Sequence, residues 1–222
     1  MDSLFSEMMA VFSAVASDDA WTMRQAFATN GAWLAGLVVM LVAAIGLLIL
    51  YRLIPALDRH LERTVMVYTY LLIAGIIFVE VFRRFVLNQQ SPWSTTLPPF
   101  LFLVMTWFGC AFNVRLRTHL AFSEFRTNMP PAAQLLCLIL DAVLWLVLCW
   151  IVVVTGSKVA ANSASNFQIL LGTDGVLQWW FLITVPIAFT LMATRVIENL
   201  LDDIANFRNG RELISPAVIG AD

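Results

Sequence analysis

Residues 32–54 read AWLAGLVVMLVAAIGLLILYRLI, and this run decides the class of the protein. An α-helix needs about 20 apolar residues to cross the hydrocarbon core of a bilayer, and the run carries no charge before Arg52. A cleaved signal peptide is excluded, because the apolar core is too long, the leader before it is acidic, and no small-residue cleavage site follows. We therefore expect a retained membrane helix.

Four further runs along the chain have the same character. They are continuous rather than alternating, which favours helices over the strands of a barrel. The composition agrees, since 60% of the residues are hydrophobic and only 13% are charged. We expect an all-α integral membrane protein with five transmembrane helices, the last of them kinked at Pro186. The four further spans are approximately 64–87, 98–118, 132–155 and 176–201.

The arginines predict an orientation. Placing the connection between the first two helices in the cytoplasm puts nine basic residues inside and four outside, as the positive-inside rule prefers. The N-terminus is then periplasmic and the C-terminus cytoplasmic. The inner residues are Arg52, Arg59, Arg63, Arg115, Arg117, Arg126, Arg195, Arg208 and Arg211, and the outer ones are Arg24, Arg83, Arg84 and Lys158.

Several function classes lack support in the sequence. The net charge of −2 offers no basic field for nucleic acid. The three cysteines lie inside apolar runs without a CxxC pair, so we expect buried thiols and neither a metal nor a cofactor. The two histidines, His60 and His119, both fall at the predicted cytoplasmic edge, which disfavours a haem held between helices. No catalytic group is indicated, and we do not expect an enzyme.

The first 20 residues carry a weaker amphipathic pattern that predicts a helix lying on a surface. That surface is either the membrane or a partner protein, and the lack of lysine and arginine gives it no hold on anionic lipid. The apolar face is formed by Leu4, Met8, Val11 and Val15 with Phe5, Met9 and Phe12 beside them, and Ser6, Glu7 and Ser13 lie opposite.

Few polar residues fall inside the spans, namely Glu80, Arg83, Arg84, Asn113 and Asp141. Glu80 and Arg84 are four residues apart, so they can pair along one helix face. Asp141 lies about nine residues into its helix, roughly 14 Å deep, and a carboxylate near the midplane needs a donor within the bundle or from a partner. A coupling-ion role for Asp141 is the alternative.

Two groups of residues at the membrane edges are candidates for contacts. Arg115, Arg117 and His119 close the third span, where they either hold its orientation or bind lipid phosphate. Three tryptophans, Trp93, Trp179 and Trp180, are expected at the opposite interface, as anchors that can also pack on a partner.

The order of these segments resembles a known family. LDRHLERTVMVYTYLLIAGIIFVEVFRRFVLN is followed by PWSTTLPPFLFLVMTWFGCAFNVRLRTHLAF, in which glycine comes sixteen residues after tryptophan, arginine six after glycine and histidine ten after it. WWFLITVPIAFTLMATRVIENL then places a proline inside the last helix. Residues 58–210 resemble the small membrane subunit of tripartite ATP-independent periplasmic (TRAP) transporters, although Thr95 and Thr96 stand where that family usually has acidic residues.

The resemblance implies a role beside larger partners. A periplasmic binding protein would capture an organic anion, a large membrane subunit would import it with sodium, and this chain would brace the large subunit, with phospholipids between them. It divides the chain into a four-helix body at 58–210, an N-terminal extension at 1–57 with an extra helix, and a cytoplasmic tail at 211–222. An independent small carrier or channel, or an assembly factor for another complex, are the alternatives; the few intramembrane polar groups disfavour a carrier.

Overall fold

The computed structural model describes residues 2–117, 126 and 129–213. Five helices in this part are long and apolar enough to cross a membrane, which confirms the predicted fold class. They are α3 (Gly31–Leu53), α4 (Pro55–Val86), α5 (Leu97–Leu116), α7 (Pro131–Ser165) and the pair formed by α8 (Trp179–Leu182) and α9 (Thr184–Arg208). Two shorter helices, α1 (Asp2–Ala16) and α2 (Ala20–Phe27), precede them.

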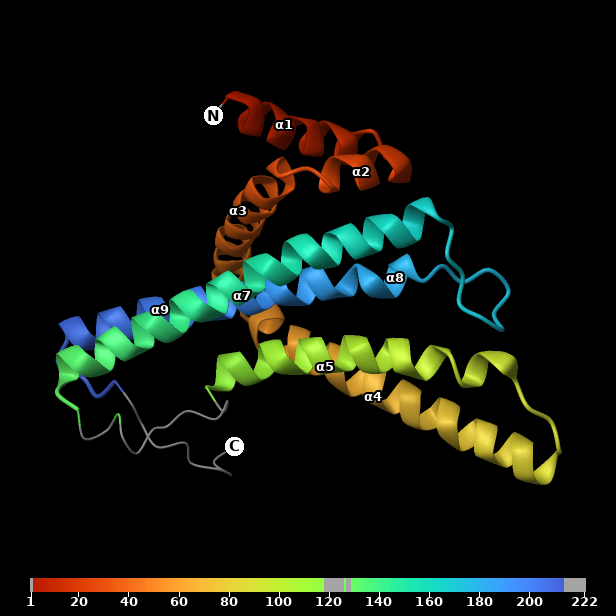
Figure 1. The fold of residues 1–222 in the computed structure, drawn as a ribbon. Helices are drawn as coiled ribbons and strands as arrows, with labels where there is room; N and C mark the ends of the chain where they lie inside the picture. Colours follow the sequence, from red (N-terminus) through yellow and green to blue (C-terminus); the bar gives the residue numbers. More distant parts are fainter. Residues whose placement is uncertain (1, 118–125, 127–128, 214–222) are drawn as a thin grey trace.

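Helix α9 is the centre of the bundle. It packs against α7, α5 and α3, and half of its most apolar stretch is buried. Small residues let the neighbouring helices approach closely, and Ala188 and Ala193 are fully buried beside Phe189 and Met192. Helix α4 lies at the outside, where it packs mainly along α5 (Figure 1).

The connection from α3 to α4 is a single residue, Ile54. Its backbone angles, φ −126° and ψ 84°, lie outside the helical region that a following proline disfavours, and Pro55 then opens α4, where a missing amide donor costs nothing. The second span therefore begins nine residues before the predicted Thr64, because the charged stretch 55–63 is helical without being apolar.

Helix α7 is also longer than predicted. It starts at Pro131, as expected, but continues to Ser165 instead of ending near Thr155. Its 35 residues give a length of about 52 Å at 1.5 Å per residue, well beyond the roughly 30 Å core of a bilayer. Because α7 is longer than the bilayer core, its bounds do not fix where Asp141 lies in the membrane, and the depth of this residue stays a prediction.

The last span loses one helical hydrogen bond near Pro186. Helix α8 ends at Leu182 and α9 begins at Thr184, and Ile183 between them keeps helical backbone angles, φ −66° and ψ −21°. Pro186 has no N–H to donate to the carbonyl of Leu182, four residues earlier, so the interruption lies where proline removes that bond. The kink expected at Pro186 stays a prediction.

The N-terminal segment forms a helical pair against the start of α3 and the end of α7 (Figure 1). Met8 and Val11 are buried against Ala32 and Ala35, so the predicted apolar face is partly confirmed. Leu4 and Val15, predicted for the same face, are exposed. Glu7, predicted to face away, instead accepts a hydrogen bond from the Gly31 N–H at 2.9 Å and caps α3.

Candidate functional site

A buried arginine joins three helices at the end of the bundle where α4 begins. Arg195 of α9 is 1% exposed and donates from Nε to Glu62 Oε1 at 2.8 Å, and Glu62 of α4 is 0% exposed. Arg195 also binds Asp58 and Glu198, and its guanidinium lies over the Tyr51 ring of α3, 4.2 Å from the centroid. We call Arg195, Glu62, Asp58, Glu198 and Arg115 the Arg195 network.

Helix α5 enters the same network through Arg115. Its guanidinium donates to the side chain of Asp58 at 2.9 Å and to the Asp58 backbone carbonyl. Asp58 therefore bridges two arginines from different helices. A buried charge that loses its partner costs several kcal/mol, so the network specifies one arrangement of α4, α5 and α9.

Arg117 extends these contacts at the end of α5. Its backbone is left-handed, with φ 55°, and it ends the helix as a C-cap. The guanidinium donates to Asp203 and to the Asn199 carbonyl of α9, and the Asn199 amide donates to the Val114 carbonyl at 2.9 Å. Arg115 and Arg117 thus form ion pairs within the chain, a role that the sequence analysis did not assign, and His119 lies outside the described residues.

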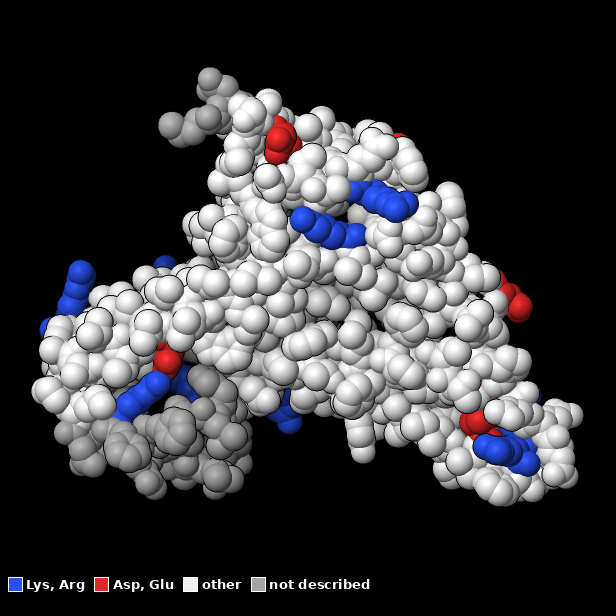
Figure 2. All heavy atoms as spheres, in the orientation of Figure 1, with Lys and Arg blue, Asp and Glu red and all other residues white. Residues whose placement is uncertain are grey.

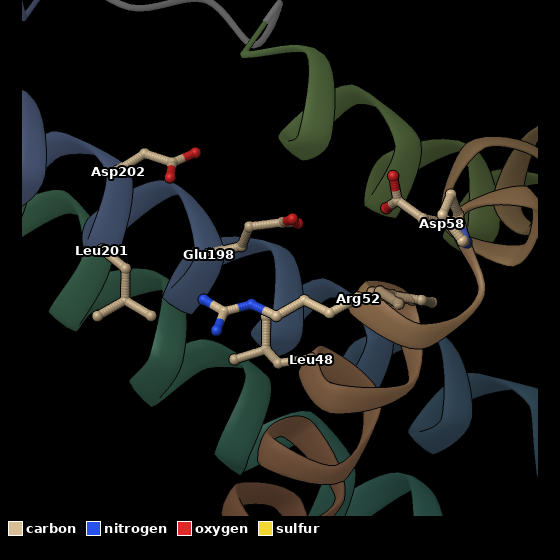
Figure 3. A pocket seen from close by; sticks show the side chains of 8 residues that line it. Leu48, Arg52, Asp58, Glu198, Leu201 and Asp202 are labelled. Carbon is tan, nitrogen blue, oxygen red and sulfur yellow. The ribbon is translucent and has the colours of Figure 1, made fainter.

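Beside the network lies a pocket of about 320 Å³ between α3, α4 and α9. Figure 3 shows Arg52 extending from α3 toward α9, with Glu198 and Asp202 on α9 and Asp58 at the start of α4. Leu48, Tyr51, Pro55 and Leu201 complete its lining. Among the described residues no group of three or more histidine, cysteine or acidic side chains is placed to hold a metal.

The outside of α4 forms a large apolar surface, which we call the α4 flank. None of the residues in the most apolar 18-residue stretch of α4 is buried. The face drawn in Figure 2, on which α5 and α7 lie in front of most of α4, also carries few charged side chains across its middle. The flank consists of Val67, Tyr68, Tyr70, Leu71, Leu72, Ile77, Phe78, Val79, Val81, Phe82, Phe85 and Val86.

At the far end of α4, Glu80 does not form the ion pair predicted with Arg84. No ion pair of Glu80, Arg83 or Arg84 occurs within the described part of the chain. The Glu80 carboxylate instead accepts from the Ser91 N–H at 3.1 Å. The four-residue spacing allows an ion pair between Glu80 and Arg84, but the turn after α4 brings the Ser91 N–H to the Glu80 carboxylate.

Trp93 lies in a short 3-10 turn (Pro92–Ser94) that packs on the loop before α8. A Cβ on Gly172 would meet the Pro92 backbone at 2.6 Å, so these segments touch where only glycine fits, and Thr96 donates to the Leu171 carbonyl at 2.8 Å. Trp179 and Trp180 form an edge-to-face pair. The structure thus joins the turn that carries Trp93 to the loop that precedes Trp179 and Trp180.

Asp141 has a donor within the chain. Its carboxylate pairs with Arg126 at 2.5 Å, and both side chains are partly exposed. Asn113 lies in the last turn of α5, exposed, and its carbonyl accepts from the Arg117 N–H that ends the helix. Neither residue is part of the Arg195 network.

Sequence reasoning missed the network itself. It assigned Arg195 to the inner side and left Asp58, Glu62 and Tyr51 without a role. Asp58 and Glu62 are four residues apart on one helix face, and Arg195 and Glu198 are three apart. Those spacings, close to the ends of two apolar spans, are the signal that could have indicated an ion-pair network between the two helices.

Comparison with known proteins fits this architecture. A family model described as tripartite ATP-independent periplasmic transporters, DctQ component, matches residues 73–206, more than half of the 222-residue chain. The sialic acid TRAP transporter small permease protein SiaQ of Vibrio cholerae serotype O1 is 22% identical over 151 residues, which cover 68% of this chain and 86% of the relative. The chain therefore belongs to the DctQ family of small membrane subunits of tripartite ATP-independent periplasmic transporters.

Proposed function

We propose that this chain braces the large membrane subunit of a sodium-driven transporter for organic carboxylates, and that the α4 flank is the surface it presents. The family consists of transporter subunits rather than enzymes, and it associates with a large membrane subunit and a binding protein. Membership and the five apolar helices make the chain a multi-pass protein of the bacterial inner membrane. The Vibrio relative serves sialic acid, itself a carboxylate, which supports that substrate class.

The observation that carries the proposal is the contrast between α4 and the rest of the bundle. In the most apolar stretch of each span, 50% of the residues are buried in the last span and 17–22% in the other three, but none in α4. A helix joined to the bundle along one side leaves the remaining sides for another protein or for lipid. Because lipid tails are as apolar as these side chains, moving the α4 flank from lipid to a protein surface gains no hydrophobic free energy. A partner protein must therefore bind the flank through close packing.

Gly75 supplies a place for such packing. It lies near the middle of the flank, and a Cβ built on it meets nothing within 4 Å. Small residues on membrane helices let a second helix approach closely. Exposed Leu71, Leu72 and Phe78 surround this notch on the same helix.

The Arg195 network supports the bracing role at the other end of α4. It joins the first two turns of α4 to α5 and α9 through ion pairs, and separating a buried pair costs free energy because it leaves an unpaired charge. A flank held this way is stiff, as a static support for moving parts requires. The N-terminal extension (1–57) is proposed as an addition to the body, since the family match begins only at residue 73.

The loops at the far end are proposed to help dock the binding protein. The turn with Trp93 and the loop around Gly172 form one surface through the Thr96–Leu171 hydrogen bond. Half-buried Trp93 and exposed Trp180 give it apolar contacts. Under the predicted topology this surface faces the periplasm.

Substituting Gly75 tests the flank directly. Gly75→Phe fills the notch, and we expect it to reduce co-purification of the large subunit at least tenfold. Gly46→Phe is the matched control, because Gly46 also lies in a membrane helix with nothing within 4 Å of its Cβ, but on α3. Equal recovery of the large subunit with both variants, at equal expression, would place the interface elsewhere.

A further inference from the structure

We infer that the pocket between α3, α4 and α9 binds the headgroup of phosphatidylethanolamine. The pocket holds about 320 Å³ and combines one arginine, three carboxylates and apolar side chains. The inference goes beyond the bracing role, because the pocket depends on α3, which lies outside the residues that match the family, although Asp58 and Glu198 also belong to the Arg195 network.

The position of the pocket suits a lipid headgroup. The apolar run of α3 ends at Arg52, and α9 becomes polar from Glu198 onward. Leu48 lies on the membrane side of Arg52, one turn earlier in α3. A ligand here would keep its tails in the hydrocarbon and its headgroup among charges.

The charges select a zwitterion. Neither Arg52 nor Asp202 forms an ion pair with another described residue, although both line the pocket. Figure 3 shows the Arg52 guanidinium reaching toward α9, where Glu198 and Asp202 project. Phosphate would bind Arg52, and an ammonium would donate to the carboxylates.

Tyr51 gives a second, independent indication. Its side chain lines the pocket and is 4% exposed, and its hydroxyl has no hydrogen-bond partner among the described residues. That hydroxyl is sealed from solvent, so a ligand would reach it only if the pocket lining moves. A phosphate or glycerol oxygen would then supply the acceptor whose absence makes a buried hydroxyl costly.

Other common phospholipids fit less well. Phosphatidylglycerol brings no ammonium and adds negative charge beside Asp58, Glu198 and Asp202. Phosphatidylcholine has a cation, but its methylated nitrogen has no N–H to donate. The pocket should therefore discriminate by headgroup when acyl chains are identical.

Native mass spectrometry of the detergent-purified full chain tests this with the three lipids in matched acyl form. We expect phosphatidylethanolamine to bind about tenfold or more tightly than the other two, as one lost charged hydrogen bond implies. Arg52→Gln should weaken binding of all three lipids, because they share the phosphate, and Asp202→Asn should reduce the preference for phosphatidylethanolamine. Arg59→Gln and Asp174→Asn, outside the pocket, should keep it. Equal binding of all three lipids, undiminished binding in Arg52→Gln, or an unchanged preference in Asp202→Asn would overturn the assignment.

Two further measurements separate the alternatives. Soluble glycerophosphoethanolamine should compete only weakly; competition as strong as that of the intact lipid would make the site one for a free solute and overturn the lipid assignment. A photoreactive phosphatidylethanolamine should label peptides of α3 and α9 in the unmodified protein, which does not rely on any variant folding. Labelling confined to other helices would also overturn the proposal.

Discussion

Arg195 and Glu62 pair through two hydrogen bonds, Nε to Oε1 at 2.8 Å and the second terminal nitrogen to Oε2 at 3.1 Å, although 133 residues separate them. This two-point geometry fixes both the distance and the rotation between α4 and α9. Because both side chains are buried, each depends on the other for solvation.

Removing one partner should therefore destabilise the subunit strongly. We expect Glu62→Ala to lower the free energy of unfolding by about 3–5 kcal/mol, since it leaves part of a buried guanidinium unpaired. Thermal unfolding in detergent measures this. Glu198→Ala removes a carboxylate from the same arginine, but Glu198 is 38% exposed, so its loss should cost about 1 kcal/mol or less.

The pair can be replaced as well as broken. Glu62→Leu combined with Arg195→Met fills similar volume without charge and should recover much of the stability lost in Glu62→Ala. Measured stability no higher in the double variant than in the single one would show that Asp58 and Glu198, the other carboxylates bound to Arg195, also depend on its guanidinium.

The five spans were predictable because hydropathy alone sets them. Helix ends were not, since residues 55–63 and 157–165 are polar and still helical, and hydropathy detects burial in lipid rather than hydrogen bonding. The partner of Arg195 was hidden for another reason. Spacing reveals pairs within one helix, such as Arg195 and Glu198, but the meeting of α4 with α9 depends on how the bundle packs. Glu80 shows the converse. Its spacing to Arg84 favours an ion pair, but its carboxylate accepts a hydrogen bond from the Ser91 N–H instead.

Glu7 provides a prediction for the N-terminal extension. Its carboxylate accepts from the first amide of α3, so Glu7→Ala should cost about 1 kcal/mol of local stability, as loss of a helix cap does. Hydrogen exchange at Gly31 should accelerate about fivefold, the factor that this energy represents. Ser6→Ala is the control, because the Ser6 hydroxyl bonds only within α1. Equal exchange in both variants would contradict the capping role.

Substitutions at Asp141 can show whether this residue acts as a hydrogen-bond acceptor or as a group that binds and releases a coupling ion. Its carboxylate accepts from Arg126, and an asparagine oxygen can do the same in part. We expect Asp141→Asn to retain more stability and transport than Asp141→Leu, with transport measured in the assembled system. Arg126→Gln should cost little in the Asp141→Leu background, because the two changes remove one interaction. Equal loss of transport with Asn and Leu, at equal stability, would favour a coupling-ion role.

Transport by the subunit alone is the broadest test. The described part of the chain has no metal-ligand cluster, and its buried charges neutralise one another instead of lining a path. We expect the purified subunit in liposomes to move no carboxylate under a sodium gradient. Uptake should return when the large subunit and the binding protein are added, and should fall again with Gly75→Phe but not with Gly46→Phe. Sodium-driven uptake by this chain alone would instead make it a carrier and remove the reason for a bracing flank.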